Sequence, residues 1–166
     1  PSIVTKFDLP FETMDIMAGW TKDKLGILIP AERQTSIYTV PATGGKATQL
    51  TTEYAAIPNW TPDGKAIYFD GAYGAYHAAI EFMPAGGGKV TRVPIDKEFE
   101  FLQPSYPLAG ISLSPDGKAI CYAGFYRRVG QPGSAIYLLP REGGRPQRLT
   151  TNKMGDLEPA WSPDGR

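Results

Sequence analysis

The chain has 166 residues, 42% hydrophobic and 20% charged, which is the composition of a globular domain large enough to bury a core. Its 17 basic and 17 acidic side chains cancel, which excludes an overall field that would gather nucleic acid. No apolar run approaches the roughly 20 residues of a membrane helix, so we expect neither a nucleic-acid partner nor insertion into a membrane.

A short phrase recurs along the chain, and its full copies predict two strands joined by a tight turn. The copies are WTKDKLGILI from Trp20 to Ile29, WTPDGKAIYF from Trp60 to Phe69, LSPDGKAICY from Leu113 to Tyr122, and WSPDGR from Trp161 to Arg166. In the second copy we expect Trp60 to end a first strand, Pro62 to set φ for the turn and Gly64 to supply a positive φ. The β-favouring segments Lys65–Phe69 and Lys118–Ala123 then predict second strands.

A second phrase follows the first three copies and predicts a hairpin. It reads IYTVPATGGKATQLT from Ile37, IEFMPAGGGKVTRVP from Ile80 and IYLLPREGGRPQRLT from Ile136. Its opening residues predict third strands over Ile37–Val40, Ile80–Met83 and Ile136–Leu139, and its Gly-Gly pair predicts a hairpin turn into a fourth strand. The segment Gly86–Thr91, GGGKVT, falls at this turn and lacks the spacing of a phosphate loop, so we interpret it as a turn.

The repeat length predicts a propeller. Trp20, Trp60, Leu113 and Trp161 are 40, 53 and 48 residues apart, the spacing of blades built from four antiparallel strands. The two phrases in this order resemble the TolB-like β-propellers, whose repeat also occurs in the propellers of prolyl-oligopeptidase-type and tricorn-type peptidases. We therefore expect an all-β fold, a partial propeller over residues 1–166, with blades near residues 14–52, 54–95 and 107–151 and the start of a further blade at 155–166.

The resemblance implies a larger ring, because such propellers usually close about six blades or more. The sequence supplies three full blades, one opening strand, and a leading segment, Ser2–Pro10, that would be the fourth strand of a preceding blade. An arc of blades leaves two apolar end faces open. We therefore interpret the chain as a piece of a larger propeller, with the remainder of its own propeller or a second copy as partner.

The repeat has two departures that predict local differences. Lys22 and Lys24 stand where Pro and Gly are expected, and Leu113 stands where Trp is expected. We expect a looser first turn or a different packing at these corners.

In a meander blade the tight turns lie on one face and the connections of variable length lie on the other. The second-to-third-strand connections, near residues 30–36, 70–78 and 124–134, share that other face with the long blade-to-blade connection at 96–110. They carry an unusual set of aromatic and basic residues, Tyr73, Tyr76, His77, Phe101, Tyr106, Tyr126, Arg127 and Arg128. Tyr and Arg are enriched at binding hot spots, so these are the candidates for a partner-binding site. The alternative for any single residue is that it covers a gap between blades or is simply solvated.

No constellation of residues predicts catalysis or a metal site. His77 and Cys121 are the single histidine and cysteine, too few for a His/Cys metal site, and the chain has no G-x-S-x-G element. We expect no catalytic residue, no metal and no cofactor, and we expect Cys121 to be a small core residue. Asp15 and Asp156 each lie five residues before a tryptophan. Their carboxylates would either accept hydrogen bonds from backbone N–H groups between blades or bind a ligand or ion near the channel.

The function predicted is non-catalytic recognition of a protein, peptide or small ligand through the loop face or the channel mouth. The resemblance to TolB implies a periplasmic or otherwise extracytoplasmic setting and a protein partner, and this rests on analogy of fold. The alternative is a substrate-gating propeller of a prolyl-oligopeptidase-like or tricorn-like serine peptidase whose catalytic domain is not in this chain. Further blades beyond Arg166 would indicate the binding module, and a G-x-S-x-G element followed by Asp and His would indicate the peptidase.

Overall fold

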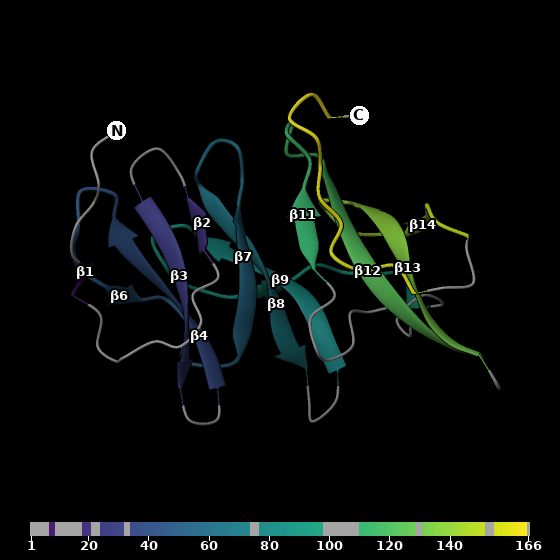
Figure 1. Ribbon diagram of the computed structural model, residues 1–166, viewed down its shortest axis with the longest axis horizontal. Coiled ribbons are helices and arrows are strands. Elements are labelled where there is room, and N and C mark those ends of the chain that lie inside the picture. Colours follow the sequence, from purple (N-terminus) through teal and green to yellow (C-terminus); the bar gives the residue numbers. More distant parts are fainter. Residues whose placement is uncertain are drawn as a thin grey trace.

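The computed structural model describes residues 7–8, 18–20, 24–31, 34–73, 77–97, 110–128, 131–151 and 155–165. These residues form strands and turns and contain no α-helix. Within the same ranges, no helix has the length and apolar character needed to cross a membrane. Three four-stranded sheets stand side by side in an arc (Figure 1).

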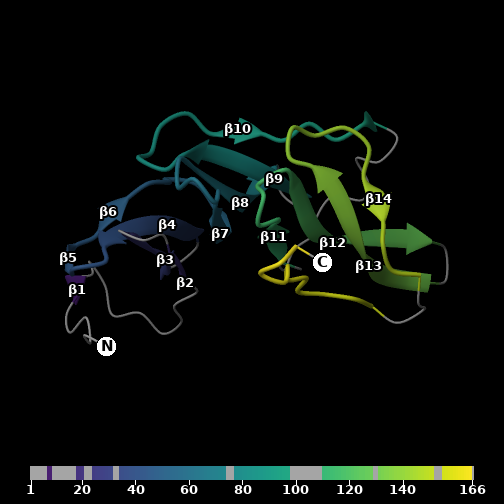
Figure 2. The same cartoon turned by 90° about the horizontal axis from the view of Figure 1, so that it is seen from above.

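Each sheet is an antiparallel meander whose strands pair in chain order. Blade 1 comprises β2 (Ala18–Trp20), β3 (Lys24–Ala31), β4 (Gln34–Pro41) and β6 (Thr48–Gln49). Blade 2 comprises β7 (Ala55–Trp60), β8 (Ala66–Tyr73), β9 (His77–Pro84) and β10 (Thr91–Arg92). Blade 3 comprises β11 (Ile111–Leu113), β12 (Ala119–Arg128), β13 (Gln131–Pro140) and β14 (Gln147–Arg148). Figure 2 shows the first strands on the concave side and β6, β10 and β14 on the convex side, so the predicted all-β partial propeller is confirmed.

The second and third strands are longer than the sequence indicated. Apart from Lys65 and Lys118, the predicted strands lie inside β8, β9, β12 and β13, and pairing continues to Ala31↔Gln34 in blade 1, Tyr73↔His77 in blade 2 and Arg128↔Gln131 in blade 3. The prediction of connections at 30–36, 70–78 and 124–134 is therefore wrong, as most of these residues belong to the ladders. Small and polar residues such as Gly71 suggested loops, but a ladder requires backbone groups rather than particular side chains.

The Pro-Asp-Gly turns have the predicted form. Gly64, Gly117 and Gly165 have φ values of 68°, 69° and 74°, which a residue with a Cβ adopts only with strain. Within these turns, one hydroxyl in each donates to the aspartate two residues later, at 2.6 Å from Thr61 to Asp63 and 2.7 Å from Ser114 to Asp116. The backbone N–H groups of Ala66 and Ala119 in turn donate to the hydroxyls of Thr61 and Ser114, at 3.0 and 2.9 Å, so each turn is fixed by its own side chains.

The first copy of the repeat differs in its turn. Trp20 pairs with Leu25, five positions later, whereas Trp60 pairs with Ile67 and Leu113 with Ile120, each seven positions later. The connection in blade 1 is thus two residues shorter than in blades 2 and 3. Residues 21–23 themselves lie outside the described ranges, so the looser turn or different packing expected at Lys22 and Lys24 stays a prediction.

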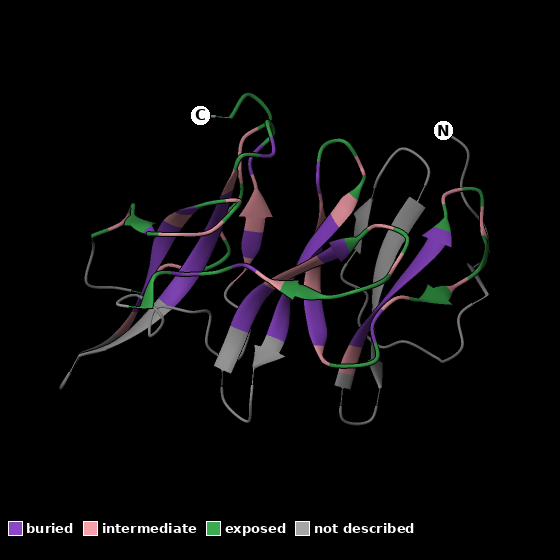
Figure 3. Cartoon of the chain, turned by 180° about the vertical axis from the view of Figure 1, so that it is seen from behind, coloured by how far each residue is buried: buried purple, intermediate pink, exposed green. Residues whose placement is uncertain are grey.

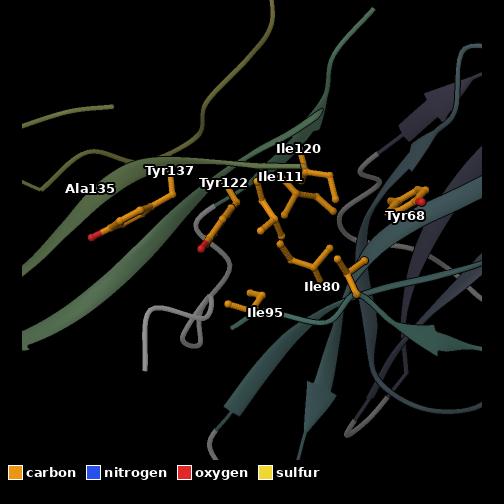
Figure 4. Packing of buried hydrophobic residues seen from close by; sticks show 10 residues of the cluster. Tyr68, Ile80, Ile95, Ile111, Ile120, Tyr122, Ala135 and Tyr137 are labelled. Atoms are coloured by element: carbon orange, nitrogen blue, oxygen red, sulfur yellow. The ribbon is translucent and has the colours of Figure 1, made fainter. Parts of the chain in front are cut away.

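The core lies between blades. One apolar cluster joins blades 1 and 2 through Ile37, Ile67, Phe69 and Met83, and a second joins blades 2 and 3 through Tyr68, Ile80, Ile111 and Tyr122 (Figure 4). Figure 3 shows that buried residues follow the middles of the strands and exposed residues the turns. Packing between sheets, rather than within one sheet, therefore holds the arc together.

The segment 155–165, which carries the last copy of the first phrase, packs against blade 3 and pairs with none of the described strands. That it begins a further blade stays a prediction. Trp161 packs against a small cluster of Cys121, Ala123 and Ile136. Its indole Nε1–H donates to the carbonyl oxygen of Ser112 at 3.2 Å, and the backbone N–H of Asp156 donates to the carbonyl oxygen of Ser134 at 3.3 Å. Cys121 is buried, as predicted for a core residue, and burial raises the pKa of its thiol to about 11.

Successive blades are also linked along the rim that carries the Gly-Gly turns. Ile95, just after β10, forms a parallel bridge with Gly144 of blade 3. The pair β1 (Phe7–Asp8) and β5 (Gly45–Lys46) is parallel too, with Phe7 opposite Gly45. Phe7 thus holds on blade 1 the place that Ile95 holds on blade 3, which is the position expected for the end of a preceding fourth strand.

A left-handed residue recurs in the repeat that the sequence did not predict. The residue three positions before Trp60, Leu113 and Trp161 is left-handed in each case, with φ of 49° at Ile57, 81° at Gly110 and 54° at Glu158. In β7 the pairing with β8 shifts register between Ala56 and Asn59. A left-handed β-branched residue such as Ile57 is strained, and the neighbouring sheets hold it in place.

Candidate partner-binding face

The blades present two different edges. The first-to-second-strand turns lie at one edge of the arc, the upper one in Figure 1, and the ends of the β3–β4, β8–β9 and β12–β13 hairpins lie at the opposite edge. We call the latter edge, marked by the final ladder pairs Ala31–Gln34, Tyr73–His77 and Arg128–Gln131, the hairpin face. The hairpin face is built on long paired strands, so its positions are fixed by continuous backbone ladders.

Five candidate binding residues belong to strands that end on the hairpin face. Tyr73 is the last residue of β8 and His77 is the first residue of β9, directly opposite each other in register. Tyr126, Arg127 and Arg128 are the last three residues of β12. Tyr76, Phe101 and Tyr106 lie outside the described residues. The backbone therefore brings the five described candidates to one edge of two adjacent blades, on strands rather than on the predicted loops.

Sequence reasoning missed Asp70, which lies in β8 three residues before its end. Its side chain faces the joint between blades 2 and 3, because side chains alternate along a strand and Tyr68 packs into that joint. Asp70 is only 1% exposed, and its Oδ1 has no hydrogen-bond partner among the described residues. Burial, and to a smaller extent the nearby charge of Glu81, raises the pKa of Asp70 to about 7.

The repeat shows how unusual this carboxyl is. Strand register places Asp70 opposite Ile80, Leu28 opposite Ile37, and Ala123 opposite Ile136, so the three positions are equivalent. The other two blades use an apolar residue there, and an unpaired buried carboxyl is costly. The signal was available in the sequence, since an acid replaces an apolar residue at a core position, but Asp70 had been assigned to a loop.

Glu81 lies on the other face of the same sheet. Its carboxyl group covers Gly71, where a Cβ would overlap Glu81 Oε2. Burial raises the pKa of Glu81, and the charge of Arg92, directly opposite it in register, lowers it. Gly71 thus provides the space that this half-buried carboxyl occupies.

The described part of the chain offers limited chemistry at this edge. Asp70 can exchange a proton near neutral pH, and in its protonated form it can donate a hydrogen bond. Within the described ranges, no group of three or more His, Cys, Asp or Glu side chains is placed to hold a metal ion. Asp15 is outside these ranges, and the role predicted for the Asp156 carboxyl stays a prediction.

Known proteins resemble this chain mainly in architecture. No protein-family model matches the sequence. An uncharacterized protein of Agrobacterium fabrum is 31% identical over 116 residues, which cover 70% of this chain and 35% of that protein. A structure assigned as TolB from Agrobacterium tumefaciens superposes with a TM-score of 0.69 at 27% identity, over 86% of this chain and 48% of that one. TolB from Acinetobacter baumannii gives 0.63 at 25% identity, over 86% of this chain and 33% of that one.

Peptidase propellers share the fold as well. The tricorn protease superposes with a TM-score of 0.61 at 17% identity, and a prolyl endopeptidase with 0.60 at 12% identity. The chain spans about a third of the curated relative's length and about half of the Agrobacterium tumefaciens structure. The molecule is thus a TolB-like propeller arc, a fold that both TolB proteins and peptidases contain.

Proposed function

We propose that this chain is a non-catalytic recognition module that binds a protein or peptide partner through its hairpin face. The observation that supports the proposal is the position of Tyr73, His77 and Tyr126–Arg128 at the ends of two long, adjacent hairpins. Residues on paired strands lose little further freedom on binding, which favours affinity. Tyr and Arg supply large contact areas and directional hydrogen bonds.

The TolB structures support the choice of a protein partner and an extracytoplasmic location. Both are at least 25% identical to this chain, whereas the peptidases are similar in fold alone. We therefore favour the recognition module over the substrate-gating propeller. The two functions differ in what would touch the hairpin face: a folded partner protein in the first case, and peptide substrates passing to a catalytic domain in the second.

Site-specific photo-cross-linking tests the proposal. A benzophenone amino acid is placed at Tyr73 or Tyr126 on the hairpin face, and at Lys65 or Lys118 near the Pro-Asp-Gly turns as matched controls. We expect one defined protein adduct from the hairpin-face positions and none from the turn positions. Adducts from the turn positions alone would contradict the proposal, and adducts only with short peptides would favour the peptidase propeller.

Substitution gives the second measurement on the identified partner. Arg127→Ala combined with Arg128→Ala should weaken binding at least about tenfold, because Arg anchors at interfaces typically carry more than 1 kcal/mol each. The matched control removes two cations from the opposite edge, Lys65→Ala with Lys118→Ala. Both lysine side chains are 83% exposed there and form only exposed ion pairs with Asp63 and Asp116, so binding should be unchanged.

A further inference from the structure

The joint between blades 2 and 3 buries two polar groups, Asp70 and Tyr122, in apolar surroundings. Asp70 is 1% exposed and Tyr122 is fully buried, and among the described residues neither Asp70 Oδ1 nor the Tyr122 hydroxyl has a hydrogen-bond partner. Figure 4 shows Tyr122 in this joint, in one cluster with Ile80, Ile111 and Ile120. Such surroundings favour the neutral form of a carboxyl group over its charged form.

Asp70 lies in the half of the joint that is nearer to the hairpin face. It is three residues before Tyr73, where the ladder of β8 and β9 ends. In that half, blade 3 presents the small register pair Gly124–Ala135, whereas nearer the turns it presents the larger pair Ile120–Leu139. The hairpin half therefore has less apolar surface to lose than the turn half when the joint opens.

No charged side chain of the described residues in this cluster compensates a charge on Asp70. The titratable side chains of the cluster are the phenols of Tyr68, Tyr122 and Tyr137, which are neutral near pH 7. Burial raises the pKa of Tyr68 and of Tyr122 above the ordinary value of 10. Glu81, on the other face of the blade 2 sheet, opposes the ionisation of Asp70 through its negative charge. The remaining elements of blade 2 and β11 contribute only apolar side chains to the cluster, namely Ile57, Ile80, Val93, Ile95, Ile111 and Leu113 among others.

We propose that the joint between blades 2 and 3 is a pH-sensitive switch for the hairpin face, in which ionisation of Asp70 draws water into the hairpin half and separates the two hairpins. The neutral carboxyl is compatible with a dry, closed joint, whereas the carboxylate requires hydration. Because Tyr73–His77 and Tyr126–Arg128 lie at the ends of these hairpins, the closed joint holds both parts of the candidate site together. The pKa of Asp70, raised to about 7, places the transition near neutral pH, with the closed form below it. The effect on binding rests on the proposed function, but the movement of the joint does not.

Thiol labelling of the full chain measures the opening of the joint without any partner. Ala135→Cys places a thiol at a fully buried position in the hairpin half, and Cys121, buried against Trp161 on the other side of blade 3, is the internal reference. Alkylation rates at both thiols are read by peptide mass spectrometry at pH 6 and pH 8, and each is divided by the rate of a free cysteine peptide at the same pH. The ionised fraction of a group with a pKa near 7 rises about tenfold between these pH values. The normalised rate at the new thiol should therefore rise about tenfold, and that at Cys121 less than about threefold.

Two further substitutions in the Ala135→Cys chain assign the response to one group. Asp70→Asn keeps the size of the side chain and removes its ionisation, so the rise should disappear. His77→Gln is the matched control, because His77 also titrates near neutral pH but loses its charge as the pH rises, so the rise should persist. A rise that survives Asp70→Asn, a rise that His77→Gln abolishes, or an equal rise at Cys121 would overturn the proposal.

The consequence for binding is measured separately, with the photo-cross-linking amino acid at Tyr126. The yield of the protein adduct should fall between pH 6 and pH 8, and Asp70→Asn should keep the yield constant. A joint that opens while the yield of the parent chain stays constant would overturn the switch and leave the hairpin face as the binding site. Absence of an adduct at both pH values would instead contradict the proposed function, since the thiol rates report on the joint without a partner.

Discussion

Blades 2 and 3 agree at their turns and differ toward the hairpin face. Their Pro-Asp-Gly turns share the same hydroxyl–carboxylate hydrogen bonds and the same left-handed glycine. Toward the hairpin face, β8 has 8 residues and β12 has 10, and the equivalent buried positions hold Asp70 and Ala123. In blades 2 and 3 the repeat therefore specifies the turn half, and the differences between these two blades lie in the hairpin half.

The largest effect should come from giving blade 3 the carboxyl of blade 2. Ala123 is fully buried and packs with Cys121, Ile136 and Trp161. Ala123→Asp should lower the free energy of unfolding by about 4 kcal/mol at pH 8, because it buries a charge without a partner and overfills the site. Urea unfolding measures the change, and Ala123→Ser is the control for volume. If Ala123→Asp lowers the free energy of unfolding no more than Ala123→Ser does, the space between blade 3 and the segment 155–165 must admit water to the new carboxylate.

Removing the buried charge of Asp70 should stabilise the protein and change the pH dependence of its stability. The folded pKa of Asp70, about 7, exceeds its ordinary value of 3.8, so the native state binds more protons than the unfolded state between these values. The free energy of unfolding is therefore highest at low pH and decreases as the pH rises from about 4 to about 8. The full difference between the folded and unfolded pKa of Asp70 corresponds to about 4 kcal/mol of this free energy. Asp70→Asn should remove most of this slope and raise stability at pH 8 by about 3 kcal/mol.

The matched control for this prediction is Asp63→Asn, at an exposed turn carboxyl whose pKa is lowered by the hydrogen bond from Thr61. It should leave the slope between pH 5 and pH 8 as in the parent protein. A parent protein whose unfolding free energy is constant over that range would show that Asp70 is ionised or solvated in the native state.

The same contrast explains what the sequence could predict. Turns are local, so the Pro-Asp-Gly motif predicted the positive φ of Gly64 and Gly117 correctly. Strand ends are set by pairing with another segment. Glycine is uncommon inside strands, so Gly71 and Gly124 suggested that β8 and β12 end before them, whereas pairing continues. Asp70 therefore falls in a predicted connection, although the apolar residues Leu28 and Ala123 at the equivalent positions of the repeat indicate a core position. The left-handed Ile57 is imposed by packing between blades, and no local motif marks it.

The candidate site was predictable in composition rather than in geometry. The sequence identified Tyr73, His77 and Arg128 because aromatic and basic residues are gathered in the predicted connections between second and third strands. It did not predict that Tyr73 and His77 lie opposite each other as the final pair of a ladder. That relation depends on the register of β8 and β9, which the hydrophobic pattern and the turn geometry determine together.

Turn glycines should give a smaller effect, and one that tests the shared half of the blades. Gly117→Ala should cost about 2 kcal/mol, because φ is 69° and the new Cβ would lie 3.1 Å from Pro62 Cδ of the preceding turn. Gly144→Ala is the control, since a Cβ there meets no atom within 4 Å and only the strain of φ 104° remains. The melting temperature should fall more in Gly117→Ala than in Gly144→Ala. The opposite order would mean that the turn containing Pro62 moves away from the new Cβ at little cost.

The smallest effect concerns a hydroxyl that blade 3 has and blade 2 lacks. Ile136 N–H donates to Thr150 Oγ1 at 2.9 Å, as Ile37 N–H donates to Thr51 Oγ1 at 2.9 Å, whereas the equivalent residue in blade 2 is Pro94, which has no hydroxyl. Thr150→Val keeps the shape but removes the acceptor, so it should cost about 1 kcal/mol. The expected signature is faster hydrogen exchange at the Ile136 amide, with exchange at Ile37 unchanged, because only the local opening of blade 3 becomes easier. If the Ile136 amide exchanged as slowly as before, the ladder rather than the threonine would protect this strand, and blades 2 and 3 would be equivalent here despite Pro94.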